Sequence, residues 1–292
     1  ETAYVLYVLP VNGETKGTVA NAENTTLASA PAVITDLYQA YLDGAEIEIS
    51  GVKYSKAANG DPVLLSATEA ETDISAAINK KSGIYFLEAA EGAIFKTSGV
   101  TGIENGDLVL IGRHTDKTVT LKPSFFFKLV VGGFAMKNVT LDMTLLDAVE
   151  KNTGYFLNNS GTEDLSKVHF DGCTVKNIKK SVYTASTNGC AFAVKSFNIV
   201  NCNFEIVVAS NTQLFNIYNC SVLDKIEEIV FDNNIVCNKD AAAVCQVFNW
   251  GNNTAQSGTT WNTKVSFCNN TLYNAPSGNG HFKFYNVGSL KM

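Results

Sequence analysis

The side chains of this chain that are best suited to bind a ligand are aromatic rings and amides that lie beside recurring phenylalanines. These phenylalanines are Phe156, Phe192, Phe215, Phe248 and Phe282. If they point inward, the residues that alternate with them point outward, because successive side chains of a β-strand face opposite sides. With nearby loop residues, the polar candidates on this predicted face are Tyr155, Lys195, Asn216, Tyr218, Asn249, Trp261, His281, Lys283 and Tyr285. Aromatic rings stack on sugar rings and amides hydrogen-bond hydroxyl groups, so the pattern predicts a glycan-binding face.

The outward positions of these strands hold no carboxylate, which disfavours catalysis there. Glycoside hydrolysis needs two carboxyl groups, and a calcium-assisted lyase needs a carboxylate cluster and a Lys or Arg base. Lys195 and Lys283 could act as bases, but they lack acidic partners on this face. Asp171 and Asp232 are expected at corners, as turn formers. We therefore predict no catalytic residue and no cofactor, with Ca²⁺ only under a lyase alternative whose acids come from loops or missing coils.

The three histidines are too far apart in the sequence to form a recognisable metal site. His169 lies between the apolar residues Val168 and Phe170 and is expected to face outward. Arg113 and His114 are expected in a polar turn between two strands. The sequence therefore predicts no metal site.

The predicted face depends on a repeat in the second half of the chain. Its apolar phrase reads FAMKNVTL, VHFDGCTV, FNIVNCNF, IVFDNNIV and VSFCNNTL, beginning at Phe134, Val168, Phe197, Ile229 and Val265. The copies follow one another at intervals of 29 to 36 residues without a helical period, which is typical of a solenoid whose coils differ in their loops. With the phenylalanine phrase, the pattern predicts three short strands per coil. Leucine-rich repeats would show a tighter period and a regular leucine frame.

Each apolar phrase contains a two-residue corner. Its second residue is, in successive copies, Asn138, Gly172, Asn201, Asn233 and Asn269. Asn and Gly tolerate the left-handed backbone conformation that a tight corner requires. Stacked coils would place these residues about 4.8 Å apart, so we expect their amides to hydrogen-bond along the column. The following residues form a second expected row, in the interior: Val139, Cys173, Cys202, Asn234 and Asn270.

The corner column resembles the asparagine ladder of right-handed parallel β-helices in the pectate-lyase-like superfamily. From about Thr35 onward the chain is also similar to uncharacterised secreted β-helix proteins of gut anaerobic bacteria, which carry a domain of unknown function. The resemblance implies an all-β fold, a right-handed parallel β-helix with three short strands per coil. It further implies a secreted or cell-surface lipoprotein, with a lipid anchor upstream of this chain, encoded near glycan-utilisation systems.

Two domains are expected. The sequence of residues 1–30 predicts a β-hairpin around Asn12-Gly13. This hairpin is either a remnant of a fibronectin-type module or a hairpin packed on the solenoid. Residues 31–292 predict the parallel β-helix. The terminal phrase GHFKFYNVGSLKM restarts a coil, so we expect the chain to be cut in mid-coil.

A short helix is expected between these two parts. Ile34, Leu37, Tyr38 and Leu42 have helical spacing, and Gly44 follows where such a helix would end. We expect this helix to cap the first coil, whose sheet edges would otherwise be exposed. GIYFLEA, AIFKTSG, DLVLIGR and TVTLKPS are then predicted strands of the early coils.

Composition excludes several classes of function. The chain has 292 residues, a net charge of −6 and a single arginine, so it lacks the basic stripe of a nucleic-acid-binding protein. It contains no apolar run of about 18 residues, and we predict no transmembrane segment. The seven cysteines are odd in number and form no CxxC pair, so we expect buried free thiols rather than a zinc ribbon or a full disulfide framework.

Three functions remain as hypotheses. The leading one is a secreted or surface monomer that binds a polysaccharide or oligosaccharide without catalysis. The second is a polysaccharide lyase or glycoside hydrolase, and the third is a structural or adhesin-like stalk. A loop-built cleft with converging carboxylates would favour the enzyme, an aromatic strip without acids the binding protein, and a featureless flank the stalk.

Overall fold

The computed structural model describes residues 4–8, 11–12, 15–16, 20–24, 34–146, 154–159, 164–185, 193–207, 212–218, 226–240, 244–251, 263–275, 280–283 and 287–292. Two compact units divide the chain, Glu1–Thr35 and Asp36–Met292. In the first unit, β1 (Tyr4–Val8) pairs antiparallel with β4 (Ala20–Asn24), and β2 (Val11–Asn12) with β3 (Thr15–Lys16). This pairing agrees with the hairpin predicted around Asn12, whereas its fibronectin-type origin stays a prediction.

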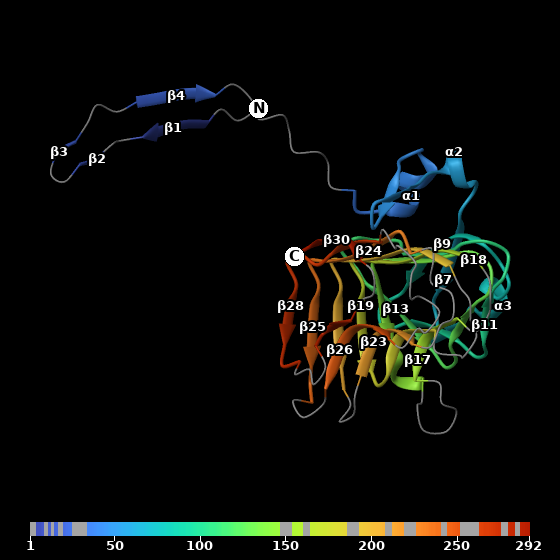
Figure 1. Ribbon diagram of the computed structural model, residues 1–292. Helices are drawn as coiled ribbons and strands as arrows, with labels where there is room; N and C mark the ends of the chain where they lie inside the picture. Colours follow the sequence, from blue (N-terminus) through green and yellow to red (C-terminus); the bar gives the residue numbers. More distant parts are fainter. Residues whose placement is uncertain are drawn as a thin grey trace. The chain divides into compact units, whose positions relative to one another are not determined.

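Three parallel sheets make up most of the second unit (Figure 1). Sheet 1 contains β7 (Val63–Ala67), β9 (Gly83–Ala89), β12 (Leu108–Gly112), β15 (Phe134–Lys137), β18 (Asp164–Asp171), β21 (Ala193–Val200), β24 (Glu228–Asp232), β27 (Thr263–Ser266) and β30 (Val287–Lys291). Sheet 2 contains β8 (Glu71–Asp73), β10 (Ile94–Thr97), β13 (Val119–Pro123), β16 (Val139–Asp142), β19 (Thr174–Ile178), β22 (Asn203–Ile206), β25 (Ile235–Asn238) and β28 (Thr271–Tyr273). Sheet 3 contains β11 (Thr101–Ile103), β14 (Phe127–Leu129), β17 (Tyr155–Asn159), β20 (Ser181–Ala185), β23 (Thr212–Tyr218), β26 (Cys245–Gly251) and β29 (Phe282–Lys283).

The order of these strands makes the unit an all-β solenoid. From β9 onward, neighbouring strands within a sheet are separated by two strands in the chain, so each of these coils supplies one strand to each sheet, whereas the first coil supplies strands only to sheets 1 and 2. The predicted three strands per coil are therefore confirmed, as are the early strands β9, β10, β12 and β13. The five apolar phrases stack in register along sheet 1, and their inward residues Phe134, Val168, Phe197, Ile229 and Val265 form one buried row.

The corners between sheets 1 and 2 have the predicted backbone conformation. The five corner residues have φ between 54° and 61°, at Asn138, Gly172, Asn201, Asn233 and Asn269. Their amides connect only in part: Asn233 Nδ2 donates to Asn201 Oδ1 at 2.7 Å, and Asn201 Nδ2 donates to Asp171 Oδ1 at 3.3 Å. Asn138 instead donates to the carbonyl of His114.

The more regular ladder runs along the next residue of each coil. Cys202 Sγ accepts from Cys173 N at 3.4 Å, Asn234 Oδ1 accepts from Cys202 N at 2.9 Å, and Asn270 Oδ1 accepts from Asn234 N at 2.9 Å. Each side chain thus satisfies a backbone donor in the preceding coil. Asn234 and Asn270 also donate to carbonyls of the preceding coil, at Ile199 and Phe231. Cys173 and Cys202 are buried free thiols, as predicted, and burial raises the pKa of Cys202.

One strand of sheet 3 differs from its predicted position. The phrase CAFAVK was expected there, but β20 (Ser181–Ala185) takes that place, between β17 and β23. Tyr183 lies in register with Phe215 and is fully buried. It is therefore the inward aromatic residue of this coil. Phe192, on which the alignment rested, lies outside the described residues.

The segment that precedes the solenoid contains α1 (Leu37–Leu42), β5 (Ile47–Ile49), β6 (Val52–Tyr54) and α2 (Lys56–Asn59). The short helix was predicted, and Asp36 caps its N-terminus by accepting from Gln39 N at 3.0 Å. Its predicted role as an end cap is wrong, because Leu37 and Tyr41 pack on outward residues of sheet 1. The short helix α3 (Ser75–Ile78), whose Ile78 is buried in the core, takes the position of a sheet 3 strand in the first coil.

Arg113 fastens this segment to the solenoid. Its guanidinium donates to both oxygens of Asp36, at 2.6 to 3.1 Å, and to Glu88 Oε2 at 3.0 Å. The hydrogen bonds from Arg113 lower the pKa of Asp36. The expected polar turn at Arg113 and His114 is thus also an attachment point for α1.

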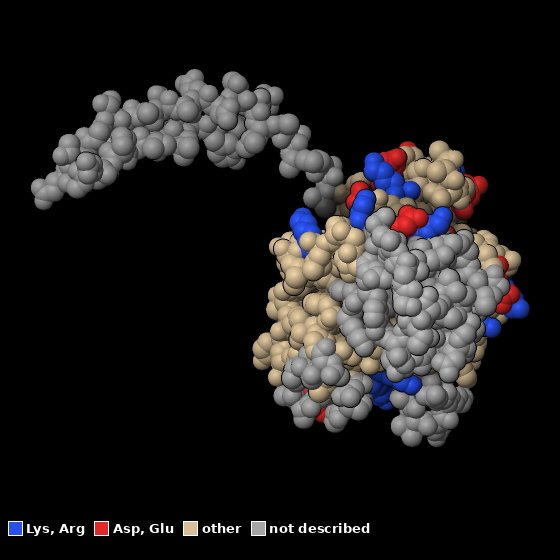
Figure 2. All heavy atoms as spheres, viewed as in Figure 1, with Lys and Arg blue, Asp and Glu red and all other residues tan. Residues whose placement is uncertain are grey.

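Acidic and basic side chains are few over the described part of the face shown in Figure 2. On the face shown in Figure 2, acidic and basic side chains lie intermixed over the α1–α2 region. A one-sign patch is therefore not visible in the described part of that face. Among the described residues, no helix is both long and apolar enough to cross a membrane.

Candidate functional site

The outer face of sheet 1 changes character along the solenoid. Over β9, β12 and the first half of β15, this face presents buried apolar residues: Ile84, Phe86, Val109, Ile111 and Ala135. The α1–β6 segment covers them with its own apolar residues Leu37, Tyr41, Ile47, Ile49 and Tyr54. We call this part of the face the covered half.

Beyond β15 polar and charged residues enter the same outward rows, interspersed with valines. Ala135 is in register with His169, then Asn198, then Val230. The neighbouring row continues from Lys137 to Asp171, Val200 and Asp232. We call the outer face of β18, β21 and β24 the open half.

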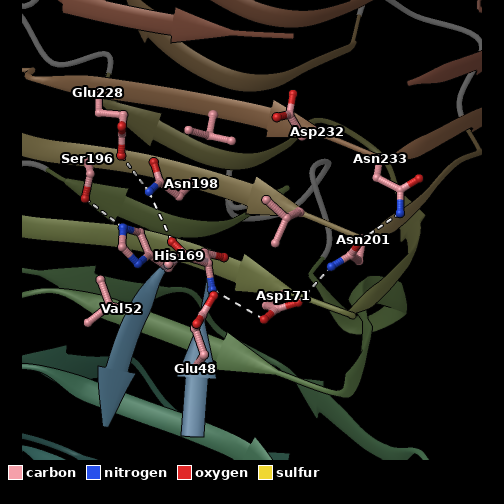
Figure 3. Close-up of a pocket in the computed structure, with 14 residues that line it drawn as sticks. Glu48, Val52, His169, Asp171, Ser196, Asn198, Asn201, Glu228, Asp232 and Asn233 are labelled. Atoms are coloured by element: carbon pink, nitrogen blue, oxygen red, sulfur yellow. Dashed lines mark hydrogen bonds between the residues drawn. The ribbon is translucent and has the colours of Figure 1, made fainter. Parts of the chain in front are cut away.

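A pocket of about 670 Å³ lies over the open half (Figure 3). The β5–β6 hairpin forms one side and the three strands form its floor. Its lining consists of Glu48, Ser50, Gly51, Val52, His169, Asp171, Ser196, Asn198, Val200, Asn201, Glu228, Val230, Asp232 and Asn233. All fourteen residues belong to the second unit.

The tip of the β5–β6 hairpin is fixed to the floor by hydrogen bonds. Ser50 and Gly51 both have positive φ, 49° and 86°, as a two-residue hairpin turn of type I′ requires. Ser50 Oγ donates to the carbonyl of Phe170 at 3.0 Å, and Ser50 N donates to Asp171 Oδ2 at 3.3 Å. Asn198 Nδ2 donates to the carbonyl of Ser50 at 3.2 Å. The hairpin is thereby held at one defined height above the strands.

His169 lies beneath this hairpin. It faces outward from β18, as predicted, but it is only 1% exposed. Its Nε2 lies 2.7 Å from Ser196 Oγ, and its buried Nδ1 has no partner among the described residues. Burial, with a contribution from Lys167, lowers the pKa of His169 to about 4, so the ring is neutral at pH 7. Because no carboxylate among the described residues orients Nδ1, the His169–Ser196 pair lacks the third member of a nucleophilic triad within that part of the chain.

Asp171 is surrounded by hydrogen-bond donors. Its Oδ2 lies 2.6 Å from Lys137 Nζ, and its oxygens also accept from Ser50 N and Asn201 Nδ2. Both oxygens of Asp171 are therefore already engaged as acceptors, Oδ2 by Lys137 and Ser50 and Oδ1 by Asn201.

The other acids of the pocket make fewer contacts. Glu228 Oε2 accepts from Asn198 Nδ2 at 3.0 Å. Asp232 Oδ1 accepts from Cys268 N at 2.6 Å and from Ser266 Oγ at 3.2 Å. Glu48 is exposed on the hairpin. The acids that the sequence placed at corners as turn formers are therefore part of the pocket.

Among the described residues, no group of three or more His, Cys, Asp or Glu side chains could hold a metal ion. Polar side chains on a rigid sheet, with a fixed hairpin beside them, form a site that can bind an extended polar ligand. The chain matches no family model, no curated protein and no solved structure. The geometry of the site is therefore the basis for a functional conclusion.

The predicted glycan face corresponds in part to the outer face of sheet 3. Asn216, Asn249 and Lys283 lie in one row, in register across β23, β26 and β29. Asn249 Nδ2 donates to Asn216 Oδ1 at 2.9 Å, and Asn249 is buried. These two amides therefore satisfy each other in part.

Two predicted residues lie where strands of sheet 3 begin: Tyr155 is the first residue of β17, and His281 directly precedes β29. Tyr155 is half-buried against Phe126, with ring centroids 5.3 Å apart, and Lys180 Nζ lies 5.9 Å from the centroid of its ring. His281 is half-buried, and its backbone carbonyl accepts from Val247 N at 2.9 Å. Leu157, Leu214 and Val247, which the alternation placed outside, are fully buried in the core.

Lys195 was assigned to the wrong sheet. It lies in β21 of sheet 1, where it is exposed, because β20 rather than CAFAVK supplies the sheet 3 strand of that coil. Tyr218 and Lys283 lie on described strands, but their side chains are not described. Trp261 and Tyr285 lie outside the described residues. The predicted aromatic strip is thus untested.

The pocket was missed although the sequence carried a signal for it. Between inward Val168 and Phe170 stands His169, and the same alternation places Asn198 and Glu228 outward on the next two strands. Aligning the outward residues of the apolar phrases would have found these polar rows. No pattern could have indicated Ser50, which meets Asp171 from 121 positions earlier in the chain.

Proposed function

We propose that the solenoid is a right-handed parallel β-helix of the pectate-lyase-like type. The order of strands in three parallel sheets, with one strand of each sheet per coil, supports this assignment. The left-handed asparagines at the corners between sheets 1 and 2 support it further. The resemblance to secreted surface lipoproteins of gut anaerobic bacteria remains part of this proposal.

Within that fold we propose a glycan-binding function, located in the pocket on the open half of sheet 1. The observation that carries the proposal is the lining itself, which combines four carboxylates and three asparagine amides with short apolar side chains. Carboxylates and amides accept hydrogen bonds from vicinal hydroxyl groups, and amides also donate to them. Val52, Val200 and Val230 offer apolar surface for the C–H face of a sugar ring.

The size of the site agrees with a short oligosaccharide. Its volume of about 670 Å³ lies in the range of small-molecule sites. The floor consists of strands whose register is fixed by backbone hydrogen bonds, so the polar groups are ordered before a ligand arrives. The ligand would lie across the strands, with the hairpin tip at one side.

The test compares this pocket with the originally predicted face. Binding of a panel of oligosaccharides is measured by calorimetry for the wild-type chain, for Glu228→Ala in the pocket and for Asn216→Ala on sheet 3. We expect binding in the millimolar to micromolar range that falls about tenfold in Glu228→Ala, since one charge-assisted hydrogen bond is lost. Asn216→Ala should bind as the wild type does. Equal loss in both variants, or loss only in Asn216→Ala, would return the site to sheet 3.

A second candidate is glycoside hydrolysis in the same pocket. Asp171 and Asp232 lie in one outward row two strands apart, which places their backbones about 10 Å from each other. This separation is close to that of the carboxyl pair in inverting glycosidases. Both carboxylates already accept hydrogen bonds, Asp171 from Ser50 N and Asp232 from Cys268 N. Release of new reducing ends that stops in Asp232→Asn would support the hydrolase, and intact oligosaccharide after long incubation would exclude it for that substrate.

A further inference from the structure

The charge of the pocket is strongly one-sided. Four of its lining residues are acids and none is Lys or Arg. Asp171 is compensated by Lys137 at 2.6 Å. Glu48, Glu228 and Asp232 form no ion pair with any side chain in the described part of the chain. The pocket thus presents three carboxylates whose charge a ligand could compensate, and it repels anionic sugars.

A second and independent observation concerns unsatisfied polar atoms in the same lining. Asn198 is 6% exposed, and both hydrogens of its amide are used, one by Ser50 O and one by Glu228 Oε2. Its Oδ1 is buried and accepts no hydrogen bond from the described residues, and the same holds for His169 Nδ1. Buried polar atoms without partners are uncommon in folded proteins and often indicate a missing ligand or water. With Asn198 Oδ1 and three carboxylates, the pocket has an excess of hydrogen-bond acceptors.

A single bare metal ion cannot contact these hydrogen-bond acceptors together. The carboxylates are spread over separate strands or separate positions: Glu228 and Asp232 are four residues apart on β24, about 13 Å along the strand. A single cation would need several oxygens within about 2.5 Å. A polyatomic ligand with several cationic donors can contact carboxylates that are this far apart. Ammonium groups supply such donors, because each carries three hydrogens and a positive charge.

We propose that the pocket recognises protonated amino groups on a sugar chain, that is, an oligosaccharide of amino sugars. This inference rests on the proposed glycan-binding function and adds the substrate class. Asn201, Asn233 and Ser196 in the same lining bond the hydroxyl groups, while Glu228 and Asp232 receive the ammonium groups. Neutral sugars bind more weakly because they leave the three carboxylates uncompensated, and uronic acids are excluded by repulsion.

The experiment uses the full chain and four defined ligands. They are a hexamer of β-1,4-linked glucosamine, its fully N-acetylated counterpart, a glucose hexamer of the same linkage and the polyamine spermidine. Calorimetry is carried out at a pH of about 6, at which aliphatic amines carry a proton. We expect the glucosamine hexamer to bind at least about tenfold more tightly than the two uncharged hexamers, because several ion pairs that each raise the affinity about two- to fivefold act together. Its affinity should fall as salt is added.

Two variants locate the effect. Glu228→Gln keeps the shape and most hydrogen bonds but removes one charge, so we expect the preference for the glucosamine hexamer to fall about two- to fivefold while neutral sugars bind as before. Glu46→Gln is the matched control, because Glu46 is exposed, lies outside the pocket lining and pairs with Lys53 at 2.7 Å. It should leave all four affinities unchanged.

The outcomes separate this inference from the function on which it rests. Equal binding of charged and uncharged hexamers, lost in Glu228→Ala, overturns the amino-sugar specificity but retains glycan binding. Spermidine binding that equals glucosamine-hexamer binding overturns the sugar requirement. Binding of none of the four ligands overturns the inference, and failure of the wider oligosaccharide panel would in addition overturn the proposed function.

Discussion

The covered half and the open half of sheet 1 share one backbone and one register but have opposite surfaces. Ile111, Lys137 and Asp171 occupy equivalent positions on three successive strands, and the surface changes from apolar to charged across them. Over the first strands the α1–β6 segment adds a second layer. Over the later strands the same segment contributes only the edge of a pocket. The outward side chains therefore determine which part of the sheet face is covered by the α1–β6 segment and which part stays accessible to a ligand.

The largest expected effect comes from removing an aromatic ring from the covered half. Phe86 is fully buried and contacts Tyr38 and Tyr41, with ring centroids 5.3 and 5.6 Å away. Phe86→Ala should lower the free energy of unfolding by about 3–5 kcal/mol, through lost burial and a cavity. Val230→Ala on the open half, where the side chain is partly exposed, should cost under about 1 kcal/mol. Urea denaturation measures both, and similar costs would show that the two halves do not differ in packing.

Acid should lower the free energy of unfolding through His169, which lies where the two halves meet. The pKa of His169 is lowered to about 4 by burial, below its unfolded value, so the unfolded chain binds more protons between these two pH values. The stabilisation is complete above about pH 6.5 and is lost as the pH falls towards 4, with about 2 kcal/mol lost by pH 5. Two charged groups also influence the pKa of His169: Lys167 lowers it and Asp107 raises it.

Denaturation curves at several pH values test this effect. His169→Gln should flatten the dependence of unfolding free energy on pH between 7.5 and 5, because the titrating group is gone. His114→Gln, at the attachment of α1 in the covered half, serves as the control and should keep most of the slope. An unchanged slope in His169→Gln would mean that another group carries the acid response.

A smaller effect is expected at the hairpin tip, where the halves meet. Ser50→Ala removes the hydrogen bond to the carbonyl of Phe170 and should cost about 1 kcal/mol. Hydrogen exchange of the β5–β6 amides should quicken, since local opening then exposes them more often. Ser66→Ala, at an exposed position of β7, should leave exchange unchanged. Unaltered protection in Ser50→Ala would show that apolar packing alone holds the hairpin.

Much of the architecture could be predicted because the interior repeats. Each apolar phrase must present the same inward pattern to its neighbours, so Phe134, Val168 and Phe197 reveal their stacking in the sequence itself. The corner asparagines could also be predicted from the sequence, because their backbone conformation limits the choice of residue. The alignment failed at β20, where Tyr183 replaces phenylalanine as the inward ring and a phenylalanine-based comparison selects the wrong phrase.

The site was harder to predict because outward residues are not constrained by the repeat. Asp171 and Asp232 fit a turn as well as a pocket, and only the position of the β5–β6 hairpin decides between these roles. That position depends on contacts between residues more than a hundred positions apart, such as Ser50 with Phe170. Neither periodicity nor local propensity contains this information.

The ladder beside the corners has a consequence for how coils find their neighbours during folding. Along it the residue type changes from valine and cysteine to the paired amides Asn234 and Asn270, which bond each other at 3.2 Å. A chain that skipped one coil while assembling would bury a carboxamide against a thiol or a methyl group, at the cost of a lost hydrogen bond in the interior. The two asparagines therefore mark the correct order of otherwise interchangeable coils, and they give a repetitive protein a means of rejecting misaligned assembly.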